Sequence, residues 1–138
     1  MIYAYPVSDI LLNLHNFWLS CMIIDPEAMA PMVRGEKDVL YKSEAGKSCP
    51  TEILDALAVF NIEGRPIWKP MHLQPIYRNH AFITSDGNGR GRSNAYIARG
   101  SIDVGADIFQ RGLCLPSDNK MTAEQQDVVI DIIHKCFE

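Results

Sequence analysis

Hydrophobic positions repeat at helical spacing most clearly near the C-terminal end of the chain. Thr122 precedes this run and Gln125 follows three positions later, which is the signature of a helix capping box. Asp127 and Asp131 lie four positions apart on the opposite face, as in a solvated helix surface. The sequence therefore predicts an amphipathic final helix. Its apolar stripe carries Val129, Ile132, Ile133 and Cys136.

Two further helices are predicted from their end signals. Pro50 suits the first turn of a helix, Glu52 favours its positive end, and Asn61 follows the last apolar position. A shorter helix is expected over about 104–111, with Gly112 as a left-handed cap. The face of the first of these helices carries Ile53, Leu54, Leu57 and Phe60.

Three short apolar runs predict strands. Residues 17–25 are rich in aromatic and β-branched side chains and stop at a proline. Residues 62–68 contain Pro66, which favours an edge position or a bulge, and residues 113–115 form the third run. Residues 27–49 are interpreted as a long excursion with one helical turn.

The resulting order is strand, helix, strand, helix, strand, helix. It predicts an α+β fold in which helices pack on one face of a small mixed or antiparallel sheet. The 138 residues fit one domain, 1–138. Residues 69–77 are expected to form an irregular, extended loop held by two prolines.

Composition narrows the class of protein. With 47% hydrophobic and 22% charged residues the chain is typical of a folded globular domain. Its net charge of −4 argues against a nucleic-acid partner. No targeting segment and no membrane span is predicted, so we expect a cytoplasmic protein. The four scattered cysteines are interpreted as reduced, buried thiols.

The segment from Trp68 to His72 is the first candidate for chemistry. Two prolines reduce the freedom of the unfolded chain and hold the loop in one shape. Lys69 and His72 would then point in fixed directions, suited to phosphate or polar sugar groups. The alternative is a solvated loop in which Trp68 covers the core and both polar side chains face water.

A glycine-rich, basic loop over 84–101 is the second candidate. Its backbone N–H groups, together with Arg90 and Arg92, suit a diphosphate. The spacing matches neither a Walker loop nor a dinucleotide fingerprint, so a surface loop is the alternative. The four histidines show no metal-ligand spacing, and no metal site is predicted. An independent small enzyme with a Cys–His pair is a further alternative.

Several uncommon residues agree in order and spacing with a known family. Three segments each resemble the corresponding segment of that family. They are the stretch from Glu63 to Pro75, the stretch from Asp107 to Ser117, and the segment leading into the last helix. The chain thereby resembles the C-terminal small domain of a DegT/DnrJ/StrS-family aminotransferase dependent on pyridoxal phosphate (PLP). The resemblance implies the small-domain fold of fold type I.

The resemblance also implies a function and a division of labour. Such enzymes transfer an amino group, usually from glutamate, to a keto sugar on a nucleotide, as in polysaccharide biosynthesis. The cofactor lysine belongs to a large domain that we expect to be absent from this chain. PLP is therefore implied for the parent enzyme, and neither cofactor nor catalysis is expected of this chain alone. The implied substrate-binding residues are His72, Lys69, Trp68 and Arg65.

A binding module is the alternative from another class. The chain would then bind a nucleotide sugar by itself, or dock onto a separately encoded large domain. An apolar N-terminal segment left uncovered would favour self-association.

Overall fold

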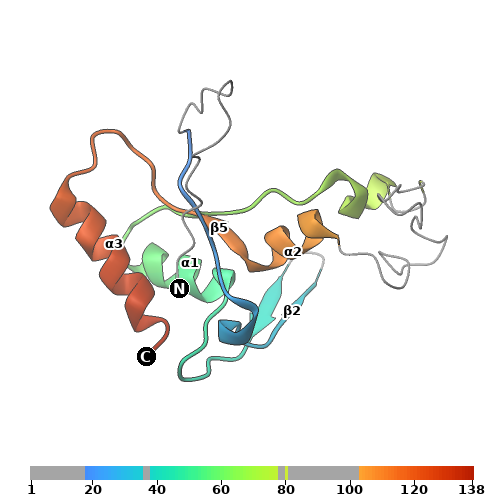
Figure 1. Ribbon diagram of the computed structural model, residues 1–138, viewed down its shortest axis with the longest axis horizontal. Helices are drawn as coiled ribbons and strands as arrows, with labels where there is room; N and C mark the ends of the chain where they lie inside the picture. Colours follow the sequence, from blue (N-terminus) through green and yellow to red (C-terminus); the bar gives the residue numbers. More distant parts are fainter. Residues whose placement is uncertain (1–17, 36–37, 78–79, 81–102) are drawn as a thin grey trace, which may run out of the picture. The chain divides into compact units, whose positions relative to one another are not determined.

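A computed structural model describes most of the chain as two compact parts (Figure 1). The described residues are 18–35, 38–77, 80 and 103–138. The larger part contains those up to Ile67 and those from Arg111 onward, and the smaller part contains those from Trp68 to Gln110. The prediction of a single domain over 1–138 stays a prediction.

A three-stranded antiparallel sheet forms the centre of the larger part. β5 (Gly112–Cys114) lies between β1 (Cys21–Ile23) and β4 (Arg65–Pro66). All three residues of β5 are buried, whereas only the middle residue of β1 is buried. The predicted α+β class is therefore confirmed, and the sheet is antiparallel.

Pro66 explains why β4 lies at the edge. In an antiparallel pair, hydrogen-bonded and non-hydrogen-bonded residue pairs alternate. Because proline has no N–H, Arg65 and Cys114 form the hydrogen-bonded pair. Pro66 and Leu113 form the non-hydrogen-bonded pair. The missing donor then faces away from β5. The predicted edge position is confirmed, although the strand is only two residues long.

Two helices cover one face of this sheet. α1 (Pro50–Val59) and α3 (Ala123–Lys135) pack against the face that carries Met22, Ile24 and Leu113. Figure 1 shows α3 next to α1, with the two helices crossing at an angle. This arrangement confirms the predicted helices on one face. The buried core consists of Met22, Ile24, Ile53, Leu57, Leu113, Val129, Ile132 and Ile133.

Local signals set the helix boundaries as predicted. The Thr122 hydroxyl accepts from the Gln125 N–H at 3.3 Å, and the Gln125 side chain accepts from the Thr122 N–H at 3.0 Å. The capping box is therefore confirmed. At the end of α1, Asn61 adopts a left-handed φ of 58°, a conformation that asparagine tolerates better than most residues.

Gly64 permits close packing beside that turn. A Cβ added there would lie 2.6 Å from Leu54 Cδ2 and 3.3 Å from the Cys114 carbonyl oxygen. A side chain at residue 64 would therefore require Leu54 to move and the β5 backbone to shift slightly, so glycine favours this close approach.

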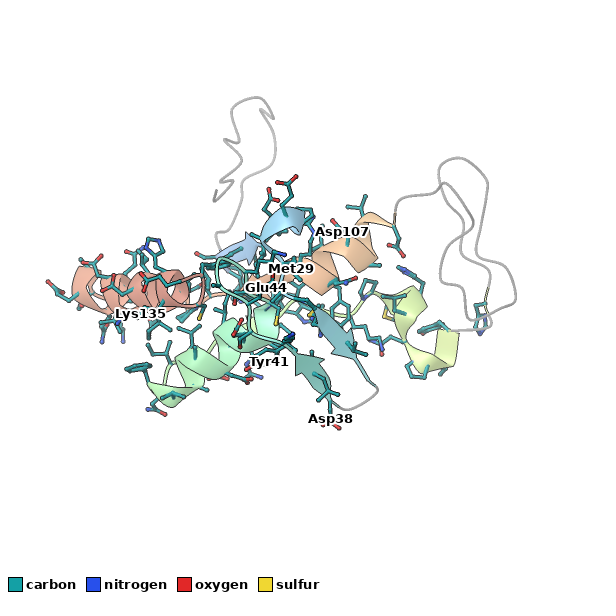
Figure 2. The ribbon with its side chains drawn as sticks, turned by 90° about the horizontal axis from the view of Figure 1, so that it is seen from below. Met29, Asp38, Tyr41, Glu44, Asp107 and Lys135 are labelled. Atoms are coloured by element: carbon teal, nitrogen blue, oxygen red, sulfur yellow. The ribbon has the colours of Figure 1, made fainter. Side chains whose placement is uncertain are left out.

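A β-hairpin replaces much of the excursion predicted for 27–49. The single helical turn is present as η1 (Pro26–Ala28), and β2 (Met32–Arg34) pairs with β3 (Val39–Tyr41). The Tyr41 hydroxyl donates to Asp55 of α1 at 3.1 Å (Figure 2). The hairpin escaped prediction because Val33 and Leu40 face solvent, so its hydrophobic side chains do not mark a buried face.

Two local predictions were wrong. Gly112 is not a left-handed cap but the first residue of β5, because the pairing of Ile23 with Gly112 extends the strand by one residue. Cys21 is exposed rather than buried, whereas Cys49 and Cys114 are buried and Cys136 is half-buried. All four thiols are free. Within the described ranges, no helix has the length and apolar character needed to cross a bilayer.

The buried face of α1 supplies a first prediction. Ile53 is fully buried, whereas Val59 of the same helix is 81% exposed. Ile53→Ala should lower the free energy of unfolding by about 2–5 kcal/mol, because it removes buried methyl groups and leaves a cavity. The control Val59→Ala should change it by less than about 0.5 kcal/mol. Urea denaturation followed by circular dichroism measures both, and equal losses would contradict this placement of the core.

Candidate substrate-binding loop

Two short turns give the predicted loop a defined shape. η2 (Met71–Leu73) follows Pro70, and η3 (Pro75–Tyr77) follows directly. The Leu73 N–H donates to the Pro70 carbonyl at 3.0 Å, and the Gln74 side-chain amide donates to the Lys69 carbonyl at 3.3 Å. The loop is therefore irregular, as predicted, but it is not extended, because the two turns fold it back on itself through hydrogen bonds of its own backbone.

The helix α2 (Val104–Arg111) begins beside this loop in the smaller part. Asp103 precedes it, and one carboxylate oxygen, Oδ1, accepts from the Ala106 N–H at 2.9 Å. This bond satisfies a backbone donor of the first turn, as an aspartate in the N-cap position does. A Cβ at Gly105 would lie 3.3 Å from the ring of Pro70, so the helix start and the loop are in close contact.

The second oxygen of Asp103 joins the loop to the helix through His72. His72 Nε2 is hydrogen-bonded to Asp103 Oδ2. The two side chains are mostly buried, with 14% of His72 and 3% of Asp103 exposed. A carboxylate only accepts hydrogen bonds, so the proton of this bond belongs to Nε2. Asp103 thus fixes both the orientation and the protonated nitrogen of the imidazole.

The remaining predicted site residues are placed as follows. Trp68 is 61% exposed and Lys69 is also exposed, in the same short segment as His72. Arg65 lies on β4 in the larger part and forms an ion pair with Glu63. Arg90 and Arg92, together with the whole glycine-rich loop over 84–101, lie outside the described residues. Trp68, Lys69 and His72 therefore lie in one short segment of the smaller part.

Asp103 is the residue that sequence reasoning missed as a partner of His72. The sequence contains a local signal for the capping role of Asp103, because an aspartate directly before a helix is a strong N-cap candidate. The hydrogen bond of Asp103 to His72 has no local signal, since the two residues are 31 positions apart. Burial of a carboxylate beside an imidazole is the feature that distinguishes this loop from an ordinary solvated one.

The described residues do not form a site that fits PLP or a metal ion. A cofactor lysine must reach the cofactor inside a closed pocket. Each described lysine lies exposed or only partly covered, and Lys47 forms an ion pair with Glu44 at 2.9 Å. In the same part of the chain, no three histidine, cysteine, aspartate or glutamate side chains gather as metal ligands do.

A hollow in the larger part is lined in part by the half-buried side chain of Glu52. Its volume is about 510 Å³, and it lies between the end of the hairpin segment, α1 and the end of α3. Glu52 accepts hydrogen bonds from Ser43 at 2.5 Å and from Ser48 at 2.8 Å. These bonds satisfy the carboxylate within the chain, so Glu52 fastens the hairpin segment to the first turn of α1.

The fold and the loop define the class coarsely, as an α+β module with an irregular polar loop. The chain is 36% identical over 88 residues to the "Putative pyridoxal phosphate-dependent aminotransferase EpsN" of Bacillus subtilis (strain 168). The match covers 64% of this chain and 19% of EpsN, so the chain spans about a fifth of that relative's length. No family model matches the chain. The similarity supports an aminotransferase relationship.

The two bonds of Asp103 lead to a second prediction. Asp103→Ala removes both, so amide exchange at Ala106 should accelerate by about fivefold to thirtyfold, the equivalent of about 1–2 kcal/mol of local stability. Asp103→Ser retains an N-cap acceptor but is too short to replace the bond to His72. In that variant, exchange at Ala106 should stay near the wild-type rate while the His72 ring nitrogen resonances shift. Both quantities are measured by NMR, and unchanged His72 resonances in either variant would contradict the pairing.

Proposed function

We propose that this chain is the C-terminal small domain of a PLP-dependent aminotransferase of the DegT/DnrJ/StrS type. The parent enzyme would act on a keto sugar linked to a nucleotide, and the chain would not transaminate alone. The observation that carries the proposal is the 36% identity to EpsN over 64% of the chain. PLP supplies amino-group transfer when it is bound in the parent enzyme.

The loop gives the proposed domain a specific task. Trp68 offers an exposed aromatic surface, and Lys69 offers a positive charge beside it. His72 contributes an imidazole that is 14% exposed and whose direction is set by Asp103. An aromatic face, an ammonium group and an oriented imidazole are suited to a sugar and its phosphates. In this proposal the chain binds and orients the substrate.

A third prediction concerns the cofactor. The purified chain mixed with one equivalent of PLP should show only the absorbance of free PLP and of the weak adducts that any exposed amine forms. The physical reason is that no described lysine is enclosed, so none is held against the cofactor. Visible absorbance after gel filtration measures the retained cofactor. A stable, stoichiometric aldimine band would overturn the proposal that catalysis requires another domain.

A fourth prediction concerns the substrate loop. Calorimetric titration with UDP-glucose and dTDP-glucose should give weak binding, and His72→Ala should reduce the affinity about tenfold. A reduction of that size corresponds to losing one hydrogen bond to a charged group. His134→Ala is the matched control, because His134 lies exposed on α3 in the larger part. Equal effects of the two substitutions would contradict a substrate role for His72.

A docking module is the second candidate, and one observation favours it. Trp18 and Trp68 are 66% and 61% exposed, which is unusual for the largest apolar side chains of a domain. Tryptophan is enriched at protein interfaces, where a separately encoded large domain would cover it. Co-purification of the chain with a large-domain protein, compared with Trp68→Ala, tests this candidate. Unchanged recovery of the variant complex would argue against docking through the loop.

A further inference from the structure

Cys21 and Cys114 meet across the sheet of the larger part, although 93 positions separate them. Cys21 lies on β1 and Cys114 lies directly opposite on β5. Their sulfur atoms are 3.7 Å apart, and both are free thiols. Cys21 is exposed, whereas only 2% of Cys114 is exposed. One thiol of the pair is therefore accessible from solvent and the other is not.

The register of the two strands favours a covalent bond between these sulfurs. The Leu115 N–H donates to the Ser20 carbonyl at 2.8 Å, and the Ile24 N–H donates to the Arg111 carbonyl at 3.0 Å. Because hydrogen-bonded pairs alternate with the other kind, Cys21 and Cys114 form a non-hydrogen-bonded pair. Such pairs have Cα atoms about 4.5 Å apart, which is within the range that disulfides span.

We propose that Cys21 and Cys114 form a two-electron thiol–disulfide site that reacts with small-molecule disulfides. The Cys21 thiolate attacks one sulfur of the oxidant, forms a mixed disulfide and releases one thiolate. The Cys114 thiolate then attacks the Cys21 sulfur and releases the second. The protein loses two thiol protons to solvent, its two sulfurs are oxidised, and the oxidant is reduced to two thiols.

The bond requires little rearrangement of the sheet. The sulfur atoms must approach by roughly 1.6 Å to reach a bonded separation of about 2.05 Å, which side-chain rotation supplies. The product ties the exposed strand β1 to the central strand β5. Cys49 and Cys136 lie elsewhere, at the start of α1 and the end of α3, and take no part.

The buried partner makes the second step dependent on pH. Burial, and to a lesser extent the neighbouring Cys21 thiol that is hydrogen-bonded to it, raises the pKa of Cys114 to about 11. Once Cys21 is in the mixed disulfide, burial remains as the cause that keeps the Cys114 pKa high. The attacking species is the thiolate. Closure should therefore accelerate about tenfold for each pH unit between pH 7 and pH 9, and should level off only when the pH passes the Cys114 pKa.

Oxidised glutathione tests the proposal on the full, reduced chain. After incubation and alkylation under denaturing conditions, the mass should show two alkylated cysteines, and peptide mapping should join Cys21 to Cys114. The thermal midpoint should rise by about 10 °C, because the bond closes a long loop of the unfolded chain. Dithiothreitol should reverse both changes.

Two variants separate the proposed pair from the other thiols. The double variant Cys49→Ser, Cys136→Ala keeps the pair and should still lose both remaining thiols to the disulfide. Cys21→Ser should form no intramolecular disulfide and should not gain thermal stability on oxidation. Glutathione retained on Cys21 at pH 9, a disulfide between two chains, or a bond that uses Cys49 or Cys136 would each overturn the proposal.

Discussion

Burial of the central strand β5 is the constraint on which the larger part depends. Leu113 is fully buried between α1 and α3, while its neighbours in the sheet on either side are β1 and β4. A strand in this position must satisfy its backbone on both edges, and the three-residue length of β5 is enough for that. The two outer strands are held to β5 by hydrogen bonds, and α1 and α3 share the apolar core with Leu113.

Among the described residues of the smaller part, polar contacts of Asp103 join the loop to the helix. Asp103 uses one oxygen for the first turn of α2 and the other for His72 of the loop. A buried carboxylate is costly unless both of its oxygens are bonded, so these two contacts depend on one another. The loop that carries the proposed substrate-binding residues is thereby fixed by the start of a helix, which is a rigid support for an oriented imidazole.

The sequence predicted the parts of the fold that are determined locally. The capping pair of Thr122 and Gln125, the proline start of α1 and its stop at Asn61 are all signals within a few residues. The hairpin was not predicted because its apolar residues Val33 and Leu40 are exposed. Its sequence therefore lacks the alternation of buried apolar and exposed polar residues that indicates a strand. In the candidate site, the irregular course of the loop was predicted from its prolines, whereas its two short turns were not. The pairing of His72 with Asp103 was not, because it depends on the chain returning after 31 residues.

Pro66 has a consequence for how the sheet can meet other polypeptides. The outer side of β4 lacks an N–H at this residue, so a further strand could not form a continuous ladder there. The other outer strand, β1, carries no proline, and its outer side keeps a full set of backbone donors and acceptors. The two edges of the sheet therefore differ in their ability to pair with a further strand. An extended segment that joins the sheet by strand addition would do so beside β1.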